Sequence, residues 1–217
     1  MVDVIETAQS PAERRRHKVR QAILEAAERV FAEEGEAGLS IRRLADEIDY
    51  SPAAIYKYFA SKQELVDELK EAFFEKILDQ VRDVPSEDAP FFDYACGYVE
   101  TYIRTALERP HHYAAAFAGQ SEVPTVDLSC DQQGLSNREL AFGMLHQMVE
   151  EGVRRGAFRP DLDTFLASKS LWASSHGLVA IIGHLPRFAT DFFSGPSHDE
   201  DHLIQSHAAF LIKGLMA

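Results

Sequence analysis

The stretch of residues 40–62, SIRRLADEIDYSPAAIYKYFASK, constrains the fold of this chain more than any other part of its sequence. Apolar residues in its first half recur at helical spacing, and Ser40 stands where its hydroxyl can cap that helix. Asp49 falls at the reversal, because an Asp tolerates the left-handed backbone that a sharp turn needs. Ser51 is placed to cap a second helix that begins with Pro52, where the missing N–H costs nothing. The pattern predicts two short helices joined by a tight turn.

The second of these helices has an unusual outer surface. Ile55 and Phe59, four residues apart, are placed to hold the helix to a core. The remaining positions are small at the start of the helix and then aromatic or basic, namely Ala53, Ala54, Tyr56, Lys57 and Tyr58. The major groove of DNA suits such a surface, because it admits one helix and is bordered by phosphates.

Three segments of this region carry a resemblance to a known family. Ser40–Ala45, Ser51–Phe59 and Ser61–Leu65, at their fixed spacing, resemble the DNA-binding domain of TetR-type transcriptional regulators. The sequence departs from the family's pattern at Asp49, where such proteins usually have Gly.

Two segments farther along the chain resemble one subgroup of this family. Leu171–Leu178, LWASSHGL, is similar to the Trp…His-Gly signature in the C-terminal domain of that subgroup, and Pro110–Tyr113 is also similar to it. Together the resemblance spans about residues 14–217. It implies an all-α protein with an N-terminal three-helix helix-turn-helix domain and a C-terminal helical domain for ligand binding and dimerisation.

The resemblance also implies a plan for the chain and a function. We expect a flexible N-terminal arm at residues 1–13, the DNA-binding domain at 14–61, and the effector-binding and dimerisation domain at 62–217. The implied function is that of a repressor, released from a palindromic operator in double-stranded DNA by a small, largely apolar effector. We expect a cytoplasmic protein with no catalytic residue, no cofactor and no metal ligand.

The charge distribution is compatible with a DNA partner, although the formal net charge is −13. Residues 1–65 carry ten Lys and Arg against twelve Asp and Glu, whereas the remainder carries twelve against twenty-three. Five basic residues crowd into 14–20, and with Arg42, Arg43, Lys57 and Lys62 they predict a local basic face. The alternative is that residues 14–20 are only the solvated start of a helix.

Apolar periodicity predicts helices along the whole chain, and no strand-like alternation occurs. The expected helices are at about residues 12–34, 65–81, 91–107, 111–117, 138–151, 165–185 and 202–216, with loops at 83–90, 119–136 and 190–201. Gly152 or Gly156 is expected to end the fifth of these helices.

Specific DNA contacts can be assigned from residue chemistry, since phosphate contacts position a protein and base contacts choose the sequence. Hydroxyls and cations suited to phosphate oxygens are those of Ser40, Arg42, Arg43, Tyr56, Lys57, Tyr58 and Lys62. The residues expected to reach base edges are Ser51, Pro52, Ala53 and Ala54. The alternative for the two tyrosines is that they merely pack on their own domain.

A single short helix contacts few base pairs, so we expect a homodimer on a palindromic site. The apolar segments 165–185 and 202–216 are the expected dimer surface, and the alternative is that both are core of the monomer. Side chains that are aromatic with some polar groups are candidates for an effector pocket: Tyr98, Tyr102, Phe117, Phe142, His146, Trp172 and His176. For each of them, ordinary core packing is the alternative.

Other classes of protein fit the sequence less well. An enzyme would draw on the nine histidines, but no HExxH or GxSxG motif occurs. His198 and His202 form an i, i+4 pair that suits weak metal binding or a solvated loop. Cys96 and Cys130 lie far apart and indicate a reduced protein with incidental thiols. The stronger rival is a helical protein-binding adaptor with a degenerate DNA-recognition helix.

Overall fold

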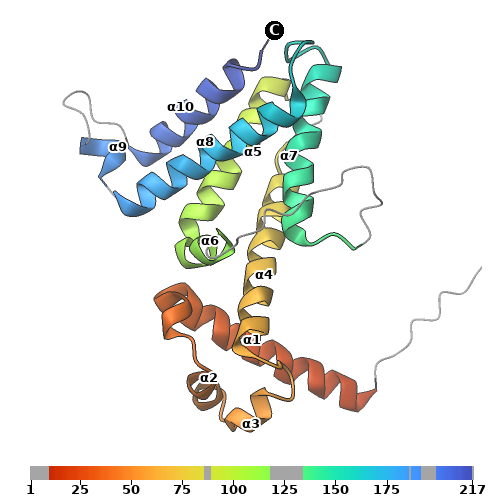
Figure 1. Ribbon diagram of the computed structural model, residues 1–217, viewed down its shortest axis with the longest axis vertical. Helices are drawn as coiled ribbons and strands as arrows, with labels where there is room; N and C mark the ends of the chain where they lie inside the picture. The colour runs from red at the N-terminus through yellow and green to blue at the C-terminus, as the bar shows by residue number, and fades with distance from the viewer. Residues whose placement is uncertain (1–9, 86–88, 118–133, 186, 192–198, 217) are drawn as a thin grey trace, which may run out of the picture. The chain divides into compact units, whose positions relative to one another are not determined.

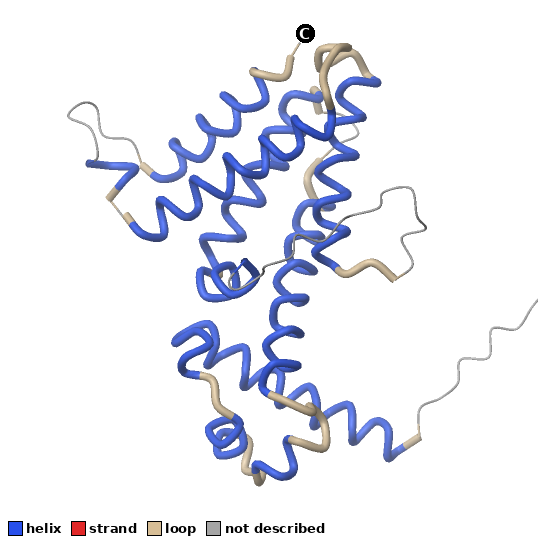
Figure 2. Tube along the Cα trace, viewed as in Figure 1, coloured by secondary structure: helices blue, strands red, loops and turns tan. Residues whose placement is uncertain are grey.

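The computed structural model describes residues 10–85, 89–117, 134–185, 187–191 and 199–216. These residues form helices joined by turns, and the one β-type contact among them is an isolated bridge between Phe158 and Met216. Figures 1 and 2 show the helices along the chain. The chain divides into two compact units, residues 1–69 and 70–217. The expected all-α fold is confirmed.

The first unit contains α1 (Pro11–Gly38), α2 (Ile41–Glu47), α3 (Pro52–Ile55) and the first turns of α4 (Lys62–Arg82). Ser10 caps α1 in a capping box with Glu13, so the helix begins inside the stretch that we expected to be the N-terminal arm. Residues 1–9, the rest of that arm, lie outside the described residues.

Two glycines shape the end of α1. Gly35 has φ 65° and ψ −161°, which interrupts the helix near the predicted end at residue 34. A glycine adopts this conformation without steric cost, and helical structure then resumes as far as Gly38.

Apolar side chains of the four helices meet in the core of the first unit. The largest that are fully buried are Ile23, Phe31, Leu44, Ile55, Phe59 and Leu65. Ile55 and Phe59 are therefore the anchors of α3, as their spacing predicted. In α4 the four-residue stripe Leu65, Leu69, Phe73, Ile77 and Val81 is buried along its whole length.

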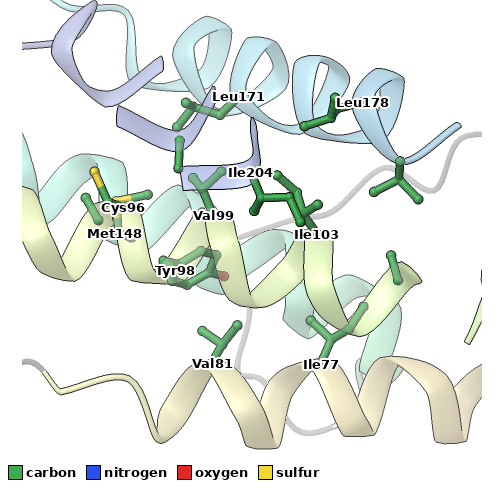
Figure 3. Packing of buried hydrophobic residues seen from close by; sticks show 14 of the residues in the cluster. Ile77, Val81, Cys96, Tyr98, Val99, Ile103, Met148, Leu171, Leu178 and Ile204 are labelled. Carbon is green, nitrogen blue, oxygen red and sulfur yellow. The ribbon is translucent and has the colours of Figure 1, made fainter. Parts of the chain in front are cut away.

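The second unit is built around α5 (Phe91–Glu108). It packs against α6 (Pro110–Phe117), α8 (Thr164–His184) and α10 (Glu200–Lys213), while α7 (Asn137–Arg154) packs against α8. Figure 3 shows Tyr98 directed from α5 toward Ile77 and Val81 of α4, and Val99 and Ile103 directed toward Leu171 and Ile204. Side chains from several helices thus form one core on both sides of α5.

Of the two glycines expected to end α7, Gly156 is the one that does: the helix continues past Gly152 to Arg154, and Gly156, with φ +70°, follows its C-cap. Other predictions about the second unit need correction or lie outside the described residues. The loop expected at 190–201 is wrong at both ends, because α9 spans Phe188–Asp191 and α10 begins at Glu200. Residues 118–133 and 192–198, which include Cys130 and His198, lie outside the described residues.

Replacing Gly152 by alanine is expected to destabilise the protein. A Cβ atom at this position would overlap the ring of Phe158 and would lie 2.8 Å from Cε1 of Phe91, so the aromatic rings would have to shift. Overpacking of this kind typically costs about 1–3 kcal/mol, and the free energy of unfolding should fall by that amount in urea denaturation.

The matched control is Gly183→Ala in α8, because nothing lies within 4 Å of the added methyl group. Alanine favours a helix interior over glycine, so this variant should be unchanged or slightly more stable. Equal losses of stability in both variants would contradict the close contact at Gly152.

Candidate DNA-binding surface and ligand pocket

The turn between α2 and α3 has the geometry that the sequence predicted. The hydroxyl of Ser40 accepts a hydrogen bond from the Arg43 N–H at 3.2 Å, and that of Ser51 accepts from the Ala54 N–H at 3.2 Å. Asp49 has φ 56°, and it is the only residue other than glycine with a positive φ among the described residues. Asp at the position where the family usually has Gly therefore adopts the left-handed turn.

The residues expected at the DNA surface in and beside α3 are mostly exposed. Ser51, Pro52, Ala53 and Lys57 are exposed, and Tyr56 is 55% exposed. Two further members of the set, Ala54 and Tyr58, are half-buried. Beyond Ile55 the backbone continues in turns, with the Phe59 N–H donating to the Ile55 carbonyl at 3.2 Å. Packing on its own domain does not account for the exposure of Tyr56.

Two of the predicted phosphate-contacting cations also make contacts within the first unit. Arg43 forms ion pairs with Glu34 at 2.7 Å and with Glu47 at 3.4 Å. The hydrogen bond from Arg43 lowers the pKa of the Glu34 carboxyl. The ammonium group of Lys62 donates to the Glu36 carbonyl at 2.8 Å. These two side chains tie the end of α1 to the helix-turn-helix, whereas Ser40 and Arg42 are exposed to solvent.

The basic residues at the start of α1 do not all share one environment. Side chains 14–18, which include four Arg or Lys, are exposed. Arg20 instead pairs with Glu68 of α4, and its guanidinium lies 4.8 Å from the centre of the Phe59 ring. Because Phe59 anchors α3, Arg20 links α1, α3 and α4 rather than extending the exposed basic face.

A pocket lies within the second unit, between α4, α5, α7 and α8. About 480 Å³ of space not filled by atoms lies between these helices, a volume that includes open solvent at its mouth. Four of the predicted effector residues line it: Tyr98, Tyr102, Phe142 and Trp172. The other lining residues, which were not predicted, are Phe74, Ile77, Val99, Ala141, Leu145, Leu171 and Ser175.

The other three predicted effector residues do not line this pocket. The rings of Phe117 and His176 pack against Trp172, at centroid distances of 5.7 and 5.0 Å. His176 also shares a hydrogen bond between its Nδ1 and the hydroxyl of Tyr113. His146 lies elsewhere: its Nδ1 is 3.2 Å from the Ser168 hydroxyl, and its ring stacks on Phe165. Phe117 and His176 therefore back the pocket wall, and His146 is buried between α7 and the start of α8.

Burial lowers the pKa of both His176 and His207 from the ordinary value near 6.5. The unfolded chain therefore binds more protons than the folded chain just below that pH, so the free energy of unfolding should fall as the pH drops. We expect a lower thermal midpoint at pH 5.5 than at pH 7.5, measured by circular dichroism, and a smaller difference in His176→Gln.

The control for this effect is His17→Gln, which changes an exposed histidine of α1. In this variant the thermal midpoint should differ between pH 5.5 and pH 7.5 by the same amount as in the parent protein. A parent protein that is equally stable at both pH values would contradict the prediction. The chosen window lies above the range in which ordinary carboxyl groups titrate.

The described residues contain no cluster of three or more His, Cys, Asp and Glu side chains suited to a metal ion. No helix within these ranges has the length and apolarity that a membrane crossing needs. Cys96 is buried in α5, and burial raises the pKa of its thiol to about 11.

The fold and the exposed turn-and-helix surface define the class of helix-turn-helix regulators. Residues 23–69 match the family model described as bacterial regulatory proteins, tetR family. Residues 97–193 match the model described as tetracyclin repressor-like, C-terminal domain.

Individual relatives agree with these matches. The HTH-type transcriptional repressor KstR2 of Mycobacterium tuberculosis is 30% identical over 152 residues, which are 68% of this chain and 72% of that protein. The HTH-type transcriptional regulator UidR of Escherichia coli K12 is 24% identical over 182 residues, 84% of this chain and 87% of that protein. The chain belongs to the TetR family, which is a family of DNA-binding transcriptional regulators.

Solved structures have the same fold. A protein of unknown function from Rhodococcus sp. RHA1 aligns over 99% of this chain and 100% of its own, with a TM-score of 0.69 and 21% identity. The structure of the ketosteroid transcriptional regulator KstR2 of Mycobacterium tuberculosis aligns over 92% and 95%, with a TM-score of 0.57 and 21% identity.

Proposed function

We propose that this protein is a homodimeric repressor that binds a palindromic operator and is released from it by a small, largely apolar effector, acting in the cytoplasm. The observation that carries the proposal is the exposed outer face of α3, held by a capped and anchored helix-turn-helix. In the proposed complex Ser51, Pro52, Ala53 and Ala54 approach base edges. The side chains proposed to position the protein on phosphates are Ser40, Arg42, Arg43, Tyr56, Lys57, Tyr58 and Lys62.

The proposed dimer is supported by apolar side chains that the single chain leaves uncovered. On α8 these are Phe165, Leu166 and Ile181, and on α10 the ring of Phe210 is 76% exposed. Large apolar side chains left exposed on α8 and α10 support a protein–protein contact there. A two-fold contact between these faces would bring two DNA-binding units into one molecule, and palindromic operators match such a two-fold protein.

The proposed effector site is the pocket between α4, α5, α7 and α8. Its wall includes Phe74 and Ile77, and both belong to α4, whose first turns also belong to the DNA-binding unit. Suppose that α4 can adopt two placements. A ligand that binds one placement more tightly would increase its population and so change the affinity for the operator. The name of KstR2, a transcriptional repressor 30% identical to this chain, supports repression as the sense of regulation.

Selection of binding sites from random double-stranded DNA tests the proposal. The enriched sequences are expected to be two-fold symmetric, with half-sites about one helical turn or a multiple of it apart and an even number of chains bound per duplex. Enrichment of no sequence would contradict it and would favour the adaptor. An asymmetric site bound by one chain would contradict the dimer.

A further inference from the structure

The chemistry of the pocket wall narrows what the pocket can hold. Most of its surface comes from aromatic and aliphatic side chains of four helices, and none of the described lining residues carries a charge. The polar groups in the lining are the hydroxyls of Tyr98, Tyr102 and Ser175 and the indole N–H of Trp172. The Ser175 hydroxyl already donates to the Leu171 carbonyl of its own helix at 2.8 Å.

One polar group in this wall has no acceptor for its proton. The hydroxyl of Tyr102 is buried, and no hydrogen bond of ordinary geometry reaches it from the described residues. Tyr113 and Trp172 act on it only as weak donors, which partly offsets the rise in pKa that burial causes, and the Tyr113 hydroxyl bonds to the imidazole of His176. Burial raises the pKa of Tyr102 to about 12, so the phenol keeps its proton at physiological pH and is available as a donor. A buried donor without an acceptor is costly, and a ligand acceptor removes that cost.

The charges around the pocket disfavour an anionic ligand. Arg138 is one turn before Phe142 on the same side of α7, and it is the basic residue nearest to the lining residues along that helix. Burial lowers the pKa of Arg138, and the carboxylates of Glu139 and Glu71 oppose that shift. A carboxylate carried into the pocket would meet no cation among the described lining residues.

We propose that the effector is a compact, uncharged and largely apolar molecule with one oxygen acceptor that takes a hydrogen bond from the hydroxyl of Tyr102. The proposal rests on the proposed function in one respect, that this pocket is the effector site. Beyond the proposed function, the proposal specifies the charge and polarity of the ligand and the residue that selects for them.

The protein contains its own reporter for this test. Trp172 is the only tryptophan of the chain and lines the pocket, so its fluorescence responds to occupancy. The probes are 1-decalone, a saturated bicyclic ketone, and decalin-1-carboxylate, which has the same ring system with an anionic group. We expect the ketone to quench or shift the Trp172 emission saturably and to bind at least about tenfold more tightly than the carboxylate.

The Tyr102→Phe variant isolates the hydroxyl. Ketone affinity should fall about tenfold, the size of one hydrogen bond between neutral groups, and the ligand-free variant should melt at a higher temperature because an unpaired buried hydroxyl is gone. Tyr94→Phe is the matched control: Tyr94 is on α5, is half-buried and packs on Phe91 outside the pocket, so ketone affinity should not change.

Four outcomes would overturn the proposal: no response to the ketone up to its solubility limit, equal or tighter binding of the carboxylate, unchanged ketone affinity in Tyr102→Phe, or a lower melting temperature of that variant. The last outcome would mean that the hydroxyl has a partner within the protein. Operator binding is measured separately without probe. Ketone binding without operator binding would reject the repressor and keep the pocket chemistry, whereas operator binding without ketone binding would reject only the present inference.

Discussion

Replacing Tyr56 and Lys62 together by alanine is expected to weaken operator binding about 1,000-fold while leaving the helical content unchanged. Tyr56 is 55% exposed, and the hydrogen bond of Lys62 to the Glu36 carbonyl is on the surface, so the fold loses little. In the proposed two-fold complex the variant removes four of the proposed phosphate contacts. At about 1 kcal/mol for each contact, the sum is about 4 kcal/mol, which corresponds to a factor of about 1,000. Fluorescence anisotropy with a selected operator measures the affinity, and circular dichroism checks the fold.

Two matched variants separate the causes of this effect. Lys76→Ala removes the same charge from the other compact unit and should leave operator affinity within a few-fold of the parent. Tyr56→Phe removes only the hydroxyl, so its loss of operator affinity should measure the contribution of the proposed hydrogen bond to phosphate. The slope of log affinity against log salt should also fall when Lys62 is lost. An unchanged affinity in the double variant would remove the basis for placing α3 on DNA.

The helix-turn-helix was predictable because its determinants are local. The caps at Ser40 and Ser51 and the left-handed turn at Asp49 involve residues within three positions of each other, where side-chain chemistry decides the backbone. The contacts of Arg43 with Glu34 and of Lys62 with Glu36 were not predictable. Glu34 and Glu36 lie on either side of Gly35, and their positions depend on how the end of α1 bends there and packs on the helix-turn-helix.

The pocket was predictable only in part, for a related reason. The aromatic residues with polar groups indicated Tyr98, Tyr102 and Trp172, since such side chains are common in ligand sites. For Phe74 and Ile77, which line the pocket, the sequence shows only helical periodicity. Periodicity predicts that a side chain is buried, but it does not distinguish a pocket-lining side chain from one packed in the core. The choice between Gly152 and Gly156 as the end of α7 was open for the same reason, because only the packing against Phe158 shows that Gly152 stays inside the helix.

Changing Phe210 to glutamate is expected to convert the proposed dimer into a monomer. Phe210 is on α10 with 76% of its surface exposed, so the monomer should fold normally with the charged side chain in water. Burying a phenylalanine contributes up to about 3 kcal/mol, and a two-fold interface loses this contribution twice. The loss of about 6 kcal/mol would weaken dimerisation by a factor on the order of 10,000, and burial of two carboxylates would add to it. Sedimentation velocity at micromolar concentration should show a single species of the monomer mass.

Operator affinity should fall together with dimerisation, because one helix-turn-helix contacts only half of a palindromic site. Phe210→Leu keeps an apolar side chain and should remain a dimer. Gln205→Glu adds the same charge to α10 at an exposed position about 140° around the helix from Phe210, and it should also remain a dimer. If Phe210→Glu still sediments as a dimer, the exposed side chains of α8 and α10 do not form the interface, and the two copies of α3 must be paired through another surface.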